Sequence, residues 1–199
     1  AAQGFGKVFE PLRHPRLDMV SVSGHKIYAP KGIGALVTRR RDRKRPPLTP
    51  LLMGGGQERG LRPGTLPVHL AAGLGLASEL AASEATSRRD HAEEMRVRVL
   101  EAITAVGAQV NGDPARSVPN IINTSIPDLD SEAVILALRD LVSISNGSAC
   151  TSATYEPSHV LTAMGLSDSR RRGAIRLSWG PGANPPDFAA VKSQIERLQ

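Results

Sequence analysis

Cysteine is nearly absent from this sequence, because its 199 residues include only one, Cys150. A lone cysteine cannot form a disulfide within the chain, so packing must hold the fold together, and a reducing compartment such as the cytoplasm is predicted. Aromatic residues make up only 3% of the chain, which leaves alanine, valine, leucine and isoleucine to build the core. No uninterrupted apolar run of about 18 residues occurs, so no membrane-spanning helix is expected.

The first residues also lack two common signals. Residues 1–4, Ala-Ala-Gln-Gly, contain neither an initiator methionine nor a leader pattern, so we expect the chain to be a fragment of a longer protein. At 199 residues it is still long enough for one large or two small domains with an apolar core.

Positive charge exceeds negative charge, with a net charge of +6 and a sequence pI of about 10.1. Much of the excess lies in two short runs, residues 39–45 and 170–172. Pro46 and Pro47 follow the first run, which favours an exposed turn. No aromatic residues interleave with these charges, as stacking on single-stranded nucleic acid would require. We therefore predict solvated loops and expect no direct binding of nucleic acid.

The first half of the chain contains both strand and helix patterns. Residues 19–23 alternate in polarity and residues 33–38 follow a Gly/Pro turn, so both are predicted strands. Residues 46–64 are rich in glycine and proline and are predicted to be a loop. Residues 68–105 have helical spacing, which predicts one long helix, or two in series broken near residues 83–86, with Thr65 as the candidate N-cap.

The second half shows shorter elements. Strands are predicted at residues 121–125, 141–145 and 174–178, and helices at 130–138 with Asp130 as cap, at 157–164 ending before Gly165, and from Asn184 onward. Strands that alternate with helices indicate an α/β or α+β fold. We predict two domains, residues 1–105 with the long helical region and a compact region of residues 106–199.

Three chemically active side chains follow the first predicted strand, in the segment Ser23-Gly24-His25-Lys26. The end of a strand in an α/β sheet is a common place for a binding site. Ser23 and His25 can donate hydrogen bonds to a phosphate, and Lys26 can form a Schiff base with an aldehyde when its amine is neutral. A surface lysine and a hydrogen-bonded histidine in a turn would show the same local pattern, so residues 23–26 alone leave both interpretations open.

The single cysteine lies in a segment of small residues, 146–152, with the sequence Asn-Gly-Ser-Ala-Cys-Thr-Ser. Structural cysteines are usually found inside apolar elements, so this context favours an exposed thiol. A free thiol is partly ionised at neutral pH, and the thiolate is the nucleophile. The local pattern is equally compatible with a catalytic and with a passive cysteine.

Taken together, two motifs resemble a known family. Residues 22–34, Val-Ser-Gly-His-Lys-Ile-Tyr-Ala-Pro-Lys-Gly-Ile-Gly, are similar to the lysine motif of the cysteine desulfurases, which are pyridoxal-phosphate (PLP) enzymes of the class V aminotransferase group. Residues 148–161 begin Ser-Ala-Cys-Thr-Ser-Ala and end Glu-Pro-Ser-His-Val-Leu, and they resemble family members that have a long mobile catalytic loop. Ala29 and Asn146 stand where the family more often has glycine and serine. The resemblance extends over essentially the whole chain.

The resemblance implies a fold and a role for several residues. The fold would be α/β, the C-terminal half of a PLP-dependent transferase of fold type I. Residues 1–105 would end the sheet of the large domain, and residues 106–199 would form a small α+β domain. Lys26 would be the Schiff-base lysine, and Cys150 would accept sulfur as a persulfide. The other implied ligands are Ser23 and His25 for the cofactor phosphate, Gln3 for its ring hydroxyl, Thr65 for the phosphate in the partner subunit of a homodimer, and Arg176 for the substrate carboxylate.

The implied reaction removes sulfur from L-cysteine and leaves L-alanine and a persulfide on Cys150. The sulfur would pass to an acceptor protein, and iron–sulfur assembly, tRNA thiolation and DNA phosphorothioation are all open as destinations. The residues that stack on the cofactor ring, pair with its nitrogen and bind substrate through an asparagine would precede Ala1. No metal site is predicted, and residues 170–172 compete with Arg176 for the carboxylate.

Two other interpretations stay open at this point. One is a related class V PLP enzyme, such as a selenocysteine lyase or an aminotransferase. The other is not an enzyme: an inactive basic fragment that dimerises, or that binds an acidic partner or nucleic acid.

Overall fold

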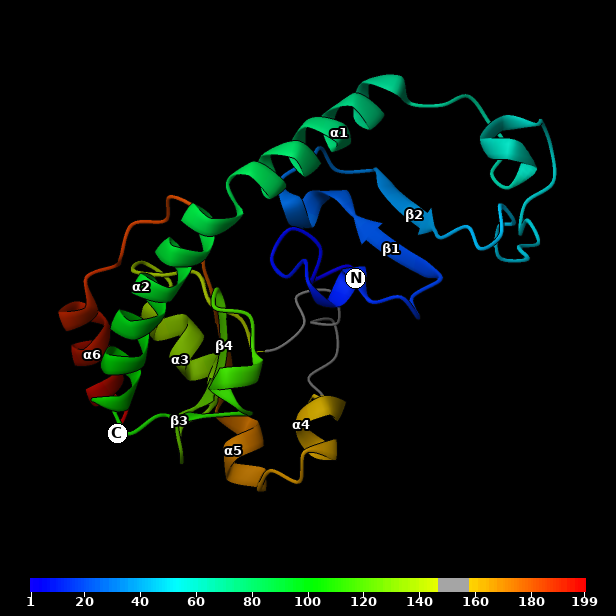
Figure 1. The fold of residues 1–199 in the computed structure, drawn as a ribbon. Helices are drawn as coiled ribbons and strands as arrows, with labels where there is room; N and C mark the ends of the chain where they lie inside the picture. Colours follow the sequence, from blue (N-terminus) through cyan, green and yellow to red (C-terminus); the bar gives the residue numbers. More distant parts are fainter. Residues whose placement is uncertain (147–157) are drawn as a thin grey trace. The chain divides into compact units, whose positions relative to one another are not determined.

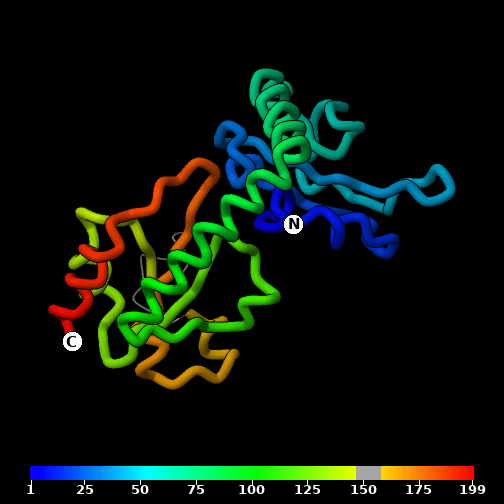
Figure 2. Tube along the Cα trace, turned by 60° about the vertical axis from the view of Figure 1, so that its left-hand side comes forward, coloured from blue at the N-terminus to red at the C-terminus, as the bar shows by residue number. Residues whose placement is uncertain are grey.

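The computed structural model describes residues 1–146 and 158–199, and residues 147–157 are drawn in grey in Figures 1 and 2. By its internal contacts the chain divides into two compact units, Ala1–Thr86 and Ser87–Gln199. This division falls inside the helical region, before the domain boundary predicted at residue 105. The predicted domain boundary at residue 105 stays a prediction.

The first unit is built on a β-hairpin and one long helix (Figure 1). Its elements are, in chain order, the 3-10 turn η1 (Pro11–Arg13), strand β1 (Met19–Ser23), the 3-10 turn η2 (Gly24–Ile27), strand β2 (Gly34–Thr38), the 3-10 turn η3 (Gln57–Gly60) and helix α1 (Val68–Ser83). β1 and β2 pair antiparallel, with Ser23 opposite Gly34. Ile27, Ala29 and Ala77 form the buried centre, which joins the turn after β1 to α1. Packing against α1 thus fixes the segment that begins at Ser23.

The second unit is built on an antiparallel sheet with the strand order β3-β4-β5. The elements are α2 (Ala85–Thr104), β3 (Gln109–Val110), the 3-10 turn η4 (Pro114–Arg116), β4 (Ile121–Ser125), α3 (Ser131–Leu138), α4 (His159–Ala163), α5 (Asp168–Arg172), β5 (Ala174–Ser178) and α6 (Phe188–Glu196). β4 lies in the middle, with Asn123 opposite Arg176 of β5.

Helices α2, α3 and α6 cover one face of this sheet (Figure 1). Ile122 of β4 packs in a cluster with residues of α2, and Ile175 of β5 packs in a second cluster with residues of α3 and α6. Side chains alternate along a strand, so Asn123 and Arg176, which lie next to these isoleucines in sequence, point to the opposite face. The sheet therefore has an apolar face under the helices and a polar face on its other side.

Most predicted elements are confirmed. β4 and β5 have the predicted bounds, β1 also does, and β2 begins one residue later than expected. The long helical region is two helices in series, α1 and α2, which meet inside the predicted break near residues 83–86. The Asp130 carboxylate caps α3 by accepting a hydrogen bond from the Glu132 N–H at 2.8 Å, as the sequence predicted.

Four predictions about the elements are wrong. Residues 141–145 are not a strand, because only Ser145 bridges to β5, through Arg176. Thr65 does not cap α1, whose N-cap is Pro67. The last helix is capped by Asp187 rather than opened by Asn184, since the Asp187 carboxylate accepts hydrogen bonds from the Ala189 and Ala190 N–H groups, both at 3.0 Å. Residues 170–172 are not a loop but the end of α5, an unpredicted helix, just as β3 is an unpredicted strand.

Gly173 joins α5 to β5 at a place where a side chain has no room. A Cβ at this position would overlap the Ile126 carbonyl oxygen and lie 2.8 Å from that of Leu129. We expect Gly173→Ala to lower the free energy of unfolding of the complete protein by about 1–3 kcal/mol, since backbone cannot yield as a side chain can. Urea denaturation measures this. Gly75→Ala is the control, because a Cβ there meets nothing within 4 Å. Equal midpoints for the two variants would contradict the prediction.

Candidate functional site

The turn after β1 brings together three of the predicted site residues. Ser23 ends the strand, and His25 and Lys26 lie in η2. The Ser23 hydroxyl oxygen is 3.2 Å from Nδ1 of His25, within hydrogen-bonding distance. The His25 side chain is exposed, whereas Ser23 and Lys26 are partly buried. A hydroxyl, an imidazole and an amine thus occupy one strand end, as the sequence predicted.

The backbone of this turn is tightly closed. The Gly24 N–H donates to the Ile33 carbonyl at 3.0 Å, and the Ala29 N–H donates to the Gly24 carbonyl at 3.1 Å. Tyr28, which follows η2, takes the left-handed conformation with φ 69°. Ala29, where the family more often has glycine, is buried without a positive φ, so alanine fits this position. These contacts hold the Lys26 backbone in a defined place.

Lys7 is a second amine near Lys26 that the sequence did not indicate. Burial lowers the pKa of Lys7, and the charge of Lys26 lowers that pKa further. The Lys7 ammonium donates to the Gln3 side-chain carbonyl at 3.4 Å. Gln3 itself is exposed, and its predicted contact with the cofactor stays a prediction. No sequence motif marked Lys7, because its proximity to Lys26 arises from the fold.

The predicted roles of two other site residues stay predictions. Thr65 is exposed in the segment before α1, which leaves its predicted contact with a partner subunit a prediction. Cys150 lies outside the described residues.

Arg176 lies in the second unit, on the polar face of the sheet. Its backbone pairs with Asn123 on one side and with Ser145 on the other, so neighbouring segments hold the strand in place on both sides. Its guanidinium Nε is buried and has no hydrogen-bond partner within residues 1–146 and 158–199. A buried cationic donor without a partner is costly, and an anion that reached it would relieve that cost. Arg176 therefore fits the predicted carboxylate ligand.

The competing arginines are engaged elsewhere. Arg170 donates from Nη2 to the Val110 carbonyl at 3.0 Å and to the Asn111 side-chain carbonyl at 2.6 Å, although its Nε is also buried without a partner in the described part. Arg171 pairs with Asp168 and lowers the pKa of that carboxyl through a hydrogen bond and its charge. Much of this short run is thus structural, which contradicts its interpretation as a solvated loop.

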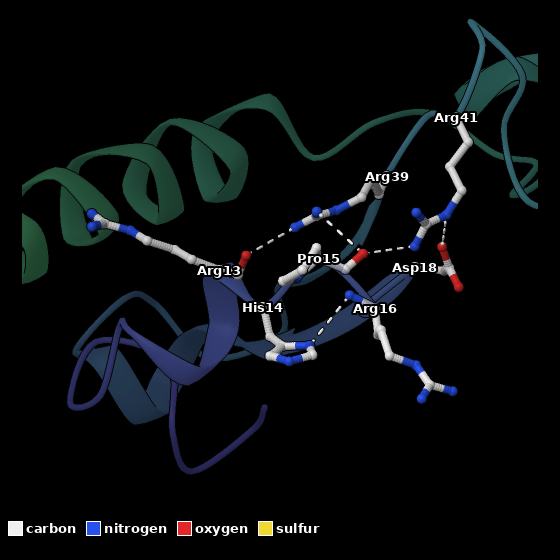
Figure 3. A network of polar contacts seen from close by, with 7 residues as sticks. All are labelled: Arg13, His14, Pro15, Arg16, Asp18, Arg39 and Arg41. Carbon is white, nitrogen blue, oxygen red and sulfur yellow. Dashed lines mark hydrogen bonds and ion pairs between the residues drawn. The ribbon is translucent and has the colours of Figure 1, made fainter.

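The longer basic run, residues 39–45, forms a turn that is exposed apart from the partly buried Arg39, as predicted. The Arg39 guanidinium donates to the carbonyls of Arg13 and Pro15 (Figure 3). The Arg41 guanidinium donates to the Pro15 carbonyl and to the Asp18 carboxylate, both at 2.7 Å. These two side chains therefore tie the hairpin to the segment before β1.

The sequence predicted neither a membrane-spanning helix nor a metal site. Among residues 1–146 and 158–199, no helix is long and apolar enough to cross a membrane. The same residues contain no group of three or more His, Cys, Asp or Glu side chains that could hold a metal ion.

The chain belongs to the class V aminotransferase family, whose family model matches residues 1–187. Members of this family are PLP-dependent enzymes. Among its relatives, the chain is 46% identical to the cysteine desulfurase IscS of Rickettsia massiliae over 204 aligned positions, which cover 100% of this chain and 49% of the relative.

Two solved structures are similar in fold. DndA from Streptomyces lividans has a TM-score of 0.77 and 47% identity, covering 92% of this chain and 51% of that one. The structure of SspA in complex with cysteine has a TM-score of 0.69 and 35% identity, covering 91% of this chain and 49% of that one. The chain spans about half the length of the relatives it matches. Its fold is therefore that of one half of a PLP-dependent transferase of fold type I, and the predicted family and fold class are confirmed.

The residues around Lys26 fit a PLP group. A phosphate needs donors, which Ser23 and His25 supply at 3.2 Å from each other, and an aldehyde needs a nearby amine, which Lys26 supplies. All three belong to a segment held rigid by packing on α1. Rigid support of this kind is what a cofactor site requires.

A substitution at Gly24 tests whether cofactor binding depends on the geometry of this turn. A Cβ at position 24 would lie 2.7 Å from the Ile33 carbonyl oxygen and 3.0 Å from Ile33 Cγ2. We expect Gly24→Ala to push the turn away from β2 and to lower the fraction of the complete protein that carries PLP, as measured by cofactor absorbance per protein. Ala29→Gly changes the same turn without adding atoms and should keep the cofactor. Full cofactor content in Gly24→Ala would show that the turn geometry does not matter.

Proposed function

We propose that the complete protein containing this chain is a PLP-dependent cysteine desulfurase, which removes sulfur from L-cysteine and leaves L-alanine and a persulfide on Cys150. The observation that carries the proposal is the cluster of Ser23, His25 and Lys26 at the end of β1, in a chain 46% identical to a cysteine desulfurase. The buried, unpartnered Nε of Arg176 supports an anionic substrate.

Each residue has a defined task in this proposal. Ser23 and His25 bind the cofactor phosphate, Gln3 contacts its ring hydroxyl, and Lys26 holds the cofactor covalently between turnovers. When bound, PLP supplies an electron sink that stabilises negative charge at the substrate Cα. The Lys26 amine would take the substrate Cα proton as a general base. Arg176 holds the substrate carboxylate by bidentate hydrogen bonds.

The sulfur transfer itself belongs to Cys150. Its thiolate attacks the sulfur of the substrate, a new S–S bond forms, and the bond between that sulfur and the substrate Cβ breaks with its electron pair left on carbon. Protonation of that carbon and return of the proton from Lys26 to the substrate Cα give L-alanine, so one L-cysteine and one Cys150 thiol become one L-alanine and one persulfide. No further oxidant is needed. The persulfide sulfur then passes to an acceptor protein.

The proposal also includes partners and a location. We propose a homodimer in which Thr65 binds the phosphate of the partner subunit. Support comes from the neighbouring loop, where Leu51 is 97% and Met53 81% exposed, as expected for apolar residues that a second subunit covers. The acceptor protein and a cytoplasmic location are proposed from the sequence, since a single reactive thiol suits a reducing compartment.

The direct test uses the complete protein with PLP and L-cysteine. We expect stoichiometric L-alanine, and mass spectrometry should find one added sulfur on the peptide that contains Cys150. A selenocysteine lyase would instead release selenide from selenocysteine and act poorly on L-cysteine, and an aminotransferase would give a keto acid. A protein without PLP absorbance that shifts nucleic acid in a salt-dependent way would be a binding module.

A further inference from the structure

The polar face of the sheet in the second unit contains a closed ring of hydrogen bonds. Nη2 of Arg170 donates to the Asn111 side-chain carbonyl at 2.6 Å. The Asn111 side-chain NH2 donates to the Ser125 hydroxyl at 2.7 Å, and that hydroxyl donates to the Arg170 backbone carbonyl at 2.6 Å. A guanidinium can only donate and a carbonyl can only accept, so each bond in the ring has one possible direction.

This ring fixes which way the Asn111 amide faces. Its oxygen must point to Arg170, which leaves its NH2 group to donate to the Asn123 side-chain oxygen at 2.7 Å. The amide of Asn123 is thereby oriented in turn, because its oxygen is the atom that faces Asn111. Its own NH2 group must then point away from Asn111. The orientation of two asparagines, ordinarily ambiguous, is thus determined by the donor-only arginine.

Asn111, Asn123 and Arg176 form one row across the sheet. The Asn111 N–H donates to the Asn123 backbone carbonyl at 2.8 Å, and Asn123 is directly opposite Arg176. Side chains at opposite positions of an antiparallel pair lie about 5 Å apart and share a face. The NH2 group of Asn123 and the guanidinium of Arg176, whose Nε is buried and unpartnered in the described residues, are therefore neighbouring donors on the same face.

We propose that Asn123 is a second ligand of the substrate carboxylate that Arg176 binds, and that Arg170, Asn111 and Ser125 are positioning residues that keep its NH2 group turned toward that anion. The inference rests on the proposed function, which makes a carboxylate the ligand of Arg176. Asn123 would supply a neutral donor beside the cationic donor of Arg176. Two donors from adjacent strands fit the two oxygens of one carboxylate.

The test compares two ligands that differ only in the carboxylate, L-alanine and L-alaninamide, on the complete PLP-loaded protein. Asn123→Asp keeps the oxygen that accepts from Asn111 but replaces the donor with a carboxylate, which pairs with Arg176 and repels the ligand. We expect L-alanine binding, measured by calorimetry, to weaken by roughly tenfold or more, and L-alaninamide binding to stay near the wild-type value. Gln109→Glu adds the same charge two residue pairs away along β3, opposite Ser125, and should leave both affinities unchanged.

A second variant tests the positioning. In Asn111→Asp the side chain has only acceptors, so it still accepts from Arg170, but the Asn123 amide must turn its NH2 group toward position 111. The Asn123 oxygen then faces the ligand, and the preference for L-alanine over L-alaninamide should fall although Asn123 is intact. Asn111→Ser, which can still donate to Asn123, should retain more of the preference than Asn111→Asp.

The outcomes separate this inference from the proposed function. If Arg176→Lys weakens L-alanine binding and Asn123→Asp does not, the inference is wrong and the proposed function stands. If neither variant changes it, the carboxylate site itself is misplaced. Should Asn123→Asp lose its folded state in a thermal melt, Asn123→Ala removes the donor without adding charge, and wild-type affinity for L-alanine in that variant would overturn the inference.

Discussion

Replacing Cys150 with alanine in the complete protein is expected to abolish persulfide formation and to leave the cofactor in place. Cys150 is the single cysteine of the 199 residues, so no other thiol in this chain can take over the attack on the substrate sulfur. Removal of a nucleophile from a covalent mechanism costs rate by a large factor, and we expect L-alanine production to fall at least about a thousandfold. Product assay and mass spectrometry of the protein measure the two effects.

The control for this prediction is Ser148→Ala, which changes a neighbouring small residue and keeps the thiol. It should retain most of the activity and the added sulfur. The PLP absorbance band should be unchanged in both variants, because the cofactor is proposed to bind through residues of the first unit. Persulfide on the protein in Cys150→Ala would show that another residue is the sulfur carrier.

Replacing Lys26 with alanine is expected to remove the covalent link to the cofactor together with the activity. The amine is proposed both to hold PLP and to take the Cα proton, so both functions are lost in one change. Borohydride reduction followed by mass spectrometry should fix PLP to Lys26 in the wild type and to no lysine in Lys26→Ala. Desulfurase activity should fall by at least about a thousandfold.

Lys31→Ala is the matched control, because Lys31 is an exposed lysine of the same motif with no proposed role in the reaction. It should keep both the covalent cofactor and the activity. Lys26→Arg adds a second comparison, since arginine keeps the positive charge but cannot be deprotonated in proteins and so cannot act as this nucleophile or base. Covalent PLP on a different lysine in the wild type, for example Lys7, would overturn the assignment.

Local sequence patterns were sufficient for much of the secondary structure. β4 and β5 alternate between residues that the core buries and residues on the polar face, and their bounds followed from that pattern. The break between α1 and α2 and the Asp130 cap followed from composition and capping chemistry. Elements that form only with a partner distant in the sequence could not be predicted from local patterns. Residues 141–145 have a strand-like composition, but only Ser145 finds a neighbour at the edge of β5.

The end of α5 shows why a charge pattern misled the prediction. Three consecutive arginines suggested a solvated run, but Arg170 reaches Val110 and Asn111, which are about sixty positions away in the sequence. Nothing near Arg170 in the chain identifies those partners. The start of α6 was misplaced for a local reason. Pro185 and Pro186 suit the first turn of a helix that begins at Asn184, but Asp187 supplies the carboxylate that accepts from the Ala189 and Ala190 N–H groups.

The candidate site likewise has residues that the sequence predicted and contacts that only the structure revealed. The sequence by itself determined the family, and it predicted site roles for Ser23, His25, Lys26, Cys150 and Arg176, because the residues of a short motif are adjacent in the chain. Only the tertiary structure decided that Lys7 lies near Lys26, that Arg170 is held by Asn111, and that Asn123 stands beside Arg176. Those relations arise from strand pairing and helix packing between distant segments, and a linear pattern does not record which distant groups the fold brings into contact.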